Sequence, residues 1–171
     1  QQEVVYSIPH NLGSTYKWQL PLGAFISSQN ANGNQVKINF SSFSGDISVS
    51  EINDNGCIGA PSVLPVRVLS GPTVSLSLNG PNTICPGDET SLLFNLQGAG
   101  SQGFDVIYSD GVENDTLENI SNGHIETITP TQSRNYFVLN VIDREYPNCN
   151  AASVRGNAFV NVNFAPTASI S

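Results

Sequence analysis

Apolar side chains recur at every second position along short runs of this sequence, and this alternation constrains the fold more than any other feature. Residues 16–20 read YKWQL, residues 36–40 read VKINF and residues 47–49 read ISV. A period of two indicates strands that bury one face. No stretch combines a 3.6-residue period with helix caps. The sequence therefore predicts an all-β fold.

The second half of the chain divides into short segments between turn signals. Expected strands lie near 74–78, 90–96, 104–109, 116–120, 124–129, 135–142 and 152–163. Asn-Gly-Pro, Pro-Gly-Asp, Gly-Ala-Gly, Asp-Gly and Asn-Gly separate them. Seven short strands in about 90 residues match the size of an immunoglobulin-like sandwich. The 15 glycines, 10 prolines and low charged content of 12% fit strands joined by tight turns.

An internal repeat sets the expected module boundaries. Residues 66–77 read VRVLSGPTVSLS and residues 160–171 read VNVNFAPTASIS, with six identities at an offset of 94. We interpret residues 1–71 as an N-terminally truncated sandwich that lacks its opening strand. Residues 72–165 form a complete sandwich, and residues 166–171 begin a following module or a linker. Coincidence between two Val/Ser-rich strands is the alternative.

The charge balance argues against two classes of partner. The net charge is −8, with six Lys and Arg residues in the chain. No basic cluster is present to neutralise nucleic-acid phosphates or to dock on anionic lipid. No apolar run approaches the roughly 20 residues of a membrane span. We therefore predict no nucleic-acid binding and no membrane insertion.

Three cysteines leave one without an intramolecular partner if two form a disulfide. Cys85 follows the first strand of the second module and Cys149 precedes its last strand, so a bond between them would close a loop of about 64 residues. Cys57 precedes Val66 much as Cys149 precedes Val160. We predict a Cys85–Cys149 disulfide and an unpaired Cys57, whose partner would lie upstream. Three reduced thiols in a cytosolic protein are the alternative.

Several motifs resemble a known family. Residues 5–8, 14–24, 45–49 and 55–57 read VYSI, STYKWQLPLGA, GDISV and NGC. They are similar to the PKD-like modules of large surface proteins in gliding and related Bacteroidota. Residues 84–88 (ICPGD), 108–111 (YSDG) and 136–139 (YFVL) resemble the Ig-like repeats that alternate with those modules.

The resemblance implies two consecutive immunoglobulin-like, PKD-like antiparallel β-sandwiches in a tandem repeat. It further implies secretion by the type IX system to the outer face of a Gram-negative outer membrane. The expected role is a non-catalytic structural or adhesive segment of an adhesin or gliding-motility filament. Expected partners are neighbouring modules, surface glycans or other cell-surface proteins. A carbohydrate-binding or spacer module of a secreted polysaccharide-degrading enzyme is the alternative.

Candidate catalytic groups are sparse. His10 and His124 lie in or near turns of different modules, and neither has a nucleophile at motif spacing. We therefore predict that the chain is not an enzyme and has no catalytic residues.

The acidic segment DGVEND at residues 110–115 raises two site hypotheses. Asp110, Glu113 and Asp115 offer oxygen ligands for calcium, although they do not match an EF-hand loop. A solvated, negatively charged turn is the alternative, and no other cofactor is predicted. Asp115-Thr116-Leu117 matches the pattern that Bacteroidota use for O-glycosylation, which makes Thr116 a candidate site.

Aromatic residues on the predicted strands have two interpretations. Tyr16 and Trp18 could form a sugar-stacking platform. Trp18, however, shares a strand face with Leu20, as the buried tryptophan of an immunoglobulin sandwich does. We predict that Tyr16, Trp18 and Tyr136 belong to the structural core.

Overall fold

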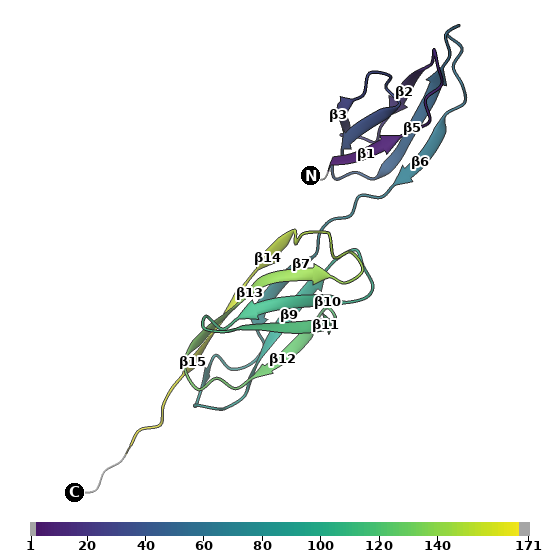
Figure 1. Cartoon of the computed structure of the whole chain (residues 1–171). Coiled ribbons are helices and arrows are strands. Elements are labelled where there is room, and N and C mark those ends of the chain that lie inside the picture. Colours follow the sequence, from purple (N-terminus) through teal and green to yellow (C-terminus); the bar gives the residue numbers. More distant parts are fainter. Residues whose placement is uncertain (1–2, 168–171) are drawn as a thin grey trace, which may run out of the picture. The chain divides into compact units, whose positions relative to one another are not determined.

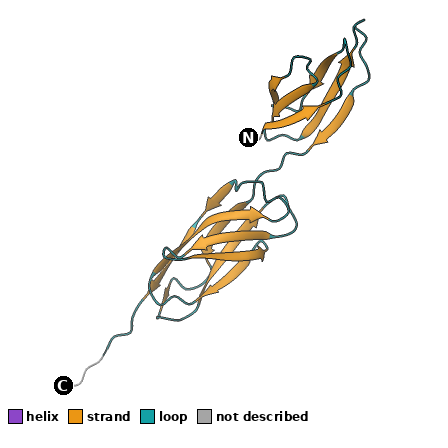
Figure 2. Ribbon diagram, in the orientation of Figure 1, coloured by secondary structure: helices purple, strands orange, loops and turns teal. Residues whose placement is uncertain are grey.

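The computed structural model describes residues 3–167, and these residues form β-strands joined by turns and loops (Figures 1 and 2). The chain divides into two compact units, Gln1–Leu69 and Ser70–Ser171. The described residues contain no helix, and so none long and apolar enough to cross a membrane. The predicted all-β class is confirmed.

Unit 1 is a small sandwich of two three-stranded antiparallel sheets. One sheet has the order β1-β4-β3 and the other β2-β5-β6. The strands are β1 (Glu3–Ser7), β2 (Thr15–Gln19), β3 (Phe25–Gln29), β4 (Gln35–Asn39), β5 (Gly45–Ile52) and β6 (Ser62–Val66). The alternation of the sequence appears directly in the core, because Val36 and Ile38 on β4, and Ile47 and Val49 on β5, are buried at every second position.

Unit 2 is a larger sandwich of a five-stranded and a four-stranded sheet. The orders are β11-β10-β13-β15-β8 and β12-β9-β7-β14. The strands are β7 (Thr73–Leu78), β8 (Thr83–Ile84), β9 (Thr90–Gln97), β10 (Phe104–Ser109), β11 (Asn114–Ile120), β12 (His124–Ile128), β13 (Arg134–Asp143), β14 (Ser153–Arg155) and β15 (Asn157–Val162). Its core contains Phe94, Leu92, Val106 and Val160, each with no exposed surface.

The last predicted strand of unit 2 is in fact two strands in different sheets. β14 pairs in parallel with β7, whereas β15 pairs antiparallel with β13. Gly156 joins them with a φ of 85°, a conformation that side chains other than glycine disfavour. A Cβ atom at this position would collide with the backbone carbonyl oxygen of Leu76 on β7. The glycine therefore lets the chain cross between the sheets against β7.

Several strand pairings of the two units correspond. β1 pairs with β4 as β9 pairs with β12, and β6 pairs with β5 as β15 pairs with β13. In unit 2, β9 also pairs with β7, and β15 with β8. Over residues 3–167, the sheet β1-β4-β3 of unit 1 contains no strand paired as β7 is with β9.

The predicted start of a following module falls at the edge of the described residues. Pro166 and Thr167 lie in no strand, and residues 168–171 are outside the part of the chain that the structure describes.

Asp143 is a buried acidic residue that the sequence does not single out. It ends β13 with 1% of its surface exposed. One carboxylate oxygen accepts a hydrogen bond from the Gly100 backbone N–H at 2.9 Å, and the other accepts from the N–H groups of Glu145 and Tyr146 at 3.0 and 3.3 Å. The side chain thereby fastens two loops to the end of the core, because buried backbone donors require acceptors.

Candidate functional site

The predicted acidic segment forms the turn between β10 and β11. Asp110 Oδ1 accepts hydrogen bonds from the backbone N–H groups of Val112 and Glu113 at 2.8 and 2.7 Å. Ser109 Oγ donates to the Glu113 carbonyl at 2.7 Å and accepts from the Gly111 N–H at 3.1 Å. Gly111 has a φ of 91°, which the tight turn requires. The side chains of Ser109 and Asp110 therefore hold the turn together.

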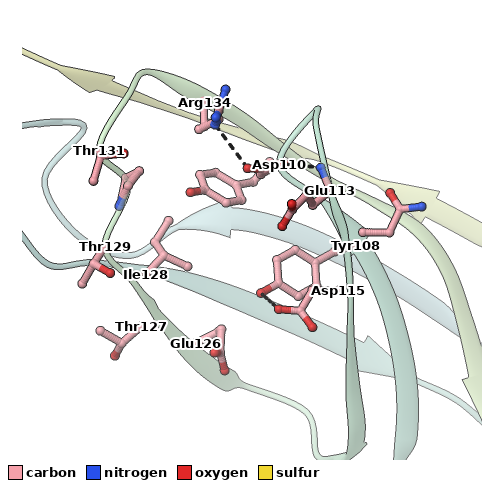
Figure 3. A pocket seen from close by; sticks show the side chains of 13 residues that line it. Tyr108, Asp110, Glu113, Asp115, Glu126, Thr127, Ile128, Thr129, Thr131 and Arg134 are labelled. Carbon is pink, nitrogen blue, oxygen red and sulfur yellow. Dashed lines mark hydrogen bonds and ion pairs between the residues drawn. The ribbon is translucent and has the colours of Figure 1, made fainter. Parts of the chain in front are cut away.

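Beside this turn lies an open cleft of about 580 Å³ between the β10–β11 hairpin and β12 with the loop that follows it (Figure 3). Its lining is polar, with carboxylates, hydroxyls and one guanidinium group. The residues are Tyr108, Asp110, Glu113, Asn114, Asp115, Glu126, Thr127, Ile128, Thr129, Pro130, Thr131, Arg134 and Tyr136. The cleft thus collects side chains from two separate stretches of the sequence, residues 108–115 and 126–136.

Two tyrosines form the buried part of the cleft lining. Tyr108 is 5% exposed and packs edge-on against Phe94, with ring centroids 5.5 Å apart. Its hydroxyl donates to Asp115 Oδ2 at 3.4 Å, a long hydrogen bond. Tyr136, 6% exposed, belongs to the same core cluster. Both rings are part of the core, while their hydroxyl ends face the cleft.

The electrostatics of the cleft follow from these positions. Arg134 Nε lies 3.2 Å from Asp110 Oδ2. The backbone N–H of Glu113 is the main cause that lowers the pKa of Asp110, and the Val112 N–H and Arg134 act in the same direction. Burial raises the pKa of Tyr108 well above 10.0, and the negative charges of Asp115 and Glu126 add to the effect. Burial, followed by Asp110, raises the pKa of Tyr136.

The three calcium candidates do not form a cation cluster. Asp110, Glu113 and Asp115 all line the cleft. Asp110 is already engaged by Arg134 and two backbone N–H groups, and Asp115 by Tyr108 and the Thr116 N–H. Over residues 3–167, no three His, Cys, Asp or Glu side chains come together to hold a metal ion.

Thr116, the candidate glycosylation site, is exposed on β11. β11 is the terminal strand of its sheet and pairs only with β10, where Thr116 lies opposite Ile107. Nothing covers this side chain over the described residues, and its modification stays a prediction.

The structure contradicts the predicted Cys85–Cys149 disulfide. Both thiols are free, as is that of Cys57. Cys85 follows β8 near the Arg134 end of β13, since the Gly87 N–H donates to the Pro130 carbonyl. Cys149 lies near the Asp143 end of β13, because its N–H donates to the Tyr146 carbonyl and the Tyr146 N–H donates to the Asp143 carbonyl. A strand of this length separates its ends by about 30 Å, whereas a disulfide needs Cα atoms within about 7 Å.

The cysteine positions nevertheless show why the spacing argument failed. Cys57 lies between β5 and β6, and Cys149 lies between β13 and β14, so the two loops are equivalent, as their distances from the last strands indicated. The spacing correctly placed Cys57 and Cys149 in equivalent loops. It did not show that Cys85 lies at the other end of the sandwich from Cys149.

The two histidines lie in separate units and in different surroundings. His10 Nδ1 is 3.4 Å from the Tyr16 hydroxyl, while His124 Nε2 is 3.2 Å from Glu126 Oε2. His124 also packs against Phe94 of the unit 2 core.

The predicted core aromatics occupy different depths. Tyr136 is buried in the unit 2 core. Trp18 is half-buried against the unit 1 core, and its Nε1 donates to the Gly33 carbonyl at 2.9 Å. Tyr16 is half-buried too, but its hydroxyl contacts the loop of residues 9–11 instead. The packing and hydrogen bond of Trp18 are those of a structural residue rather than of a sugar platform.

The acidic side of the cleft is recognisable in the sequence, whereas the opposite side is not. Glu126, Thr127 and Thr129 come from β12 and its loop, and Arg134 begins β13. No local motif links them to residues 110–115, because only the closure of the two sheets brings them together.

Comparison with known proteins gives a partial match. Residues 1–66 match the family of PKD-like domains. No curated protein shows a significant match to the chain. The matched range contains all six strands of unit 1. The first unit is therefore similar in sequence to PKD-like domains, which are generally non-catalytic modules of structural or adhesive character.

Proposed function

We propose that this chain is a structural or adhesive segment of a large secreted cell-surface protein, in which consecutive β-sandwiches act as a spacer or ligand-presenting stalk. Two features support the proposal: the PKD-like match of residues 1–66, and the presence of two compact units, each with its own core. Each unit packs its apolar residues without help from the other, as tandem modules do.

The path of the chain through unit 2 carries the proposal. The chain enters at Thr73, which pairs with Gln97 beside the Asp143 end of β13. It leaves after Val162, beyond the pairing of Arg134 with Val160 at the other end of β13. The two points are therefore separated by the length of a strand, about 30 Å. A module threaded from end to end lengthens a chain and bears tension along its strands.

Single-molecule force spectroscopy tests the spacer role. Unit 2 should unfold as one event, because its sheets share a single core. Extension of the chain from Thr73 to Val162 should release about 290 Å of contour length, since each residue spans at most about 3.6 Å when extended. Gradual extension at negligible force would contradict a load-bearing spacer.

We also propose export by the type IX system to the outer face of a Gram-negative outer membrane. The support is the resemblance of residues 14–24 and 84–88 to modules of Bacteroidota surface proteins. An antibody against this chain should label intact producing cells, and labelling should disappear when the type IX translocon is deleted. Equal surface labelling in the deletion strain would refute this route.

A further inference from the structure

The cleft beside the β10–β11 turn has properties that the spacer role does not use. It carries four carboxylates, from Asp110, Glu113, Asp115 and Glu126, against the single guanidinium of Arg134. Because Arg134 is already paired with Asp110 at 3.2 Å, the lining offers no cation to the other three carboxylates, of which Glu126 lies 3.2 Å from His124 Nε2 outside the lining. The lining therefore has a net charge of −3 when its carboxyl groups are ionised.

Tyr136 gives independent support for a ligand. Its side chain is 6% exposed, yet its hydroxyl has no hydrogen-bond partner among the described residues. No side-chain oxygen or nitrogen within residues 3–167 is both sealed from solvent and unpartnered, so this hydroxyl opens into the cleft that Tyr136 lines. The ring is buried while its hydroxyl is accessible from the cleft and unpartnered, so this oxygen can accept a hydrogen bond from a bound group.

The lining favours an organic cation over a metal ion or a neutral ligand. The described residues bring no three potential metal ligands together, and the cleft of about 580 Å³ is far larger than an ion. A neutral sugar would leave the excess negative charge uncompensated. An ammonium group donates hydrogen bonds only, and the carboxylates and phenolic oxygens of the cleft accept them. Burial is the main cause that raises the pKa of Tyr108 and Tyr136, and the nearby carboxylates add to it; the same negative charges attract a cation.

The strands beside the cleft indicate how the cation is delivered. β11 and β12 are terminal strands, one in each sheet, and each pairs with a single neighbour. The cleft is lined by the consecutive residues 126–131, from β12 into the following loop (Figure 3). An extended peptide can pair with a free strand edge and direct alternate side chains to one face.

We propose that the cleft between β11 and β12 binds a lysine side chain presented by an extended segment of a partner protein. Its ammonium group contacts the Tyr136 hydroxyl and the carboxylates of Asp115 and Glu126. This site belongs to unit 2 alone and stands whether or not the chain acts as a mechanical spacer.

The test is an NMR titration of the full chain with the capped peptide acetyl-Gly-Thr-Lys-Thr-Gly-amide. A matched peptide with norleucine in place of lysine keeps the length and the apolar stem but removes the charge. The lysine peptide should shift amide signals of residues 108–115 and 126–136, and added salt should weaken its binding. Equal binding of the norleucine peptide would overturn the proposal, as would signal changes confined to other residues.

Variants separate a specific site from diffuse attraction. Tyr136→Phe removes only an unpartnered hydroxyl, so it should leave folding intact and weaken the lysine peptide at least about fivefold. Glu126→Gln should weaken it comparably. Glu118→Gln, an exposed site on β11 outside the lining, makes the same charge change and should have little effect. Equal losses in the two Glu→Gln variants would refute a defined site.

Two further probes decide the nature of the cation. Calcium ions alone should neither shift these signals nor displace the peptide. Glucosamine carries an ammonium group without a peptide backbone and should bind more weakly than the peptide. Tighter binding of glucosamine would replace the partner protein with an amino-sugar ligand, and displacement by calcium would replace it with a metal ion.

Discussion

Replacement of Gly156 by alanine tests the crossing between the two sheets of unit 2. Gly156 has a φ of 85°, where a non-glycine residue costs about 1–2 kcal/mol. Its new Cβ atom would also collide with backbone atoms of Leu76, which cannot move aside as a flexible side chain can. Relief requires β14 to withdraw from β7, with loss of the pairs Ser153–Thr73, Val154–Val74 and Arg155–Ser75. We expect a total loss of about 3–5 kcal/mol in the free energy of unfolding.

Gly87→Ala is the matched control for this substitution. Gly87 has nearly the same φ, 84°, but a Cβ atom there would meet nothing within 4 Å. It should therefore lose only the conformational part, about 1–2 kcal/mol. The difference between the two variants isolates the contact with β7.

Urea denaturation measures both variants with an internal reference. Trp18 lies in unit 1 and is the only tryptophan, so its fluorescence reports unit 1, whereas far-ultraviolet circular dichroism reports both units. With an m-value of about 1.5 kcal/mol per molar urea, Gly156→Ala should move the unit 2 midpoint by about 2–3 M. The Trp18 transition should stay in place. Equal shifts for Gly156→Ala and Gly87→Ala, or a matching shift at Trp18, would refute the reasoning.

Three other predictions concern stability and chemistry. Asp143→Ala should cost unit 2 about 2–4 kcal/mol in chemical denaturation because it removes the carboxylate that accepts hydrogen bonds from three part-buried backbone N–H groups, and a loss below about 1 kcal/mol would contradict that role. All three cysteines should react with a maleimide without reductant, because all three thiols are free. Reductant should leave the melting temperatures of both units unchanged. Labelling of a single thiol would instead support the Cys85–Cys149 disulfide. Because the pKa of Tyr108 is raised in the folded protein, the unfolded chain loses the phenolic proton at a lower pH than the folded chain does. The free energy of unfolding of unit 2 should therefore be unaffected by this group below about pH 10 and should fall as the pH rises further. Alkaline melting curves should show that fall for the native protein, and Tyr108→Phe should reduce its slope.

Much of the strand layout could be predicted because it rests on local patterns. In unit 2 the strand from Phe104 to Ser109 begins and ends where the sequence placed it. Period-two alternation and Asp-Gly or Asn-Gly turns act within a few residues, so they are visible without any tertiary contact. β8 has only two residues and depends on its pairing with β15, and the alternation did not reveal it.

The errors share a physical cause, which is that they concern distances across the sandwich. The cysteine spacing suggested a pair, but Cys85 and Cys149 lie at opposite ends of β13. The acidic turn was visible in the sequence, but the contacts of the Asp110 carboxylate with Arg134 and with the backbone N–H groups of the turn were not. In both cases the sequence showed the chemical groups and not which neighbours would reach them.

Alternation, turn residues and the 94-residue repeat are properties of short segments and their order, and they were enough to predict consecutive β-sandwiches. The pairing of strands across the sheets, the change of sheet at Gly156 and the contacts between side chains became visible in the folded chain. Residues 110–115 and 126–136 form one cleft because sheet closure brings β11 and β12 to the same side of unit 2. Such long-range contacts depend on the packing of the whole unit, and no short segment of the sequence encodes them.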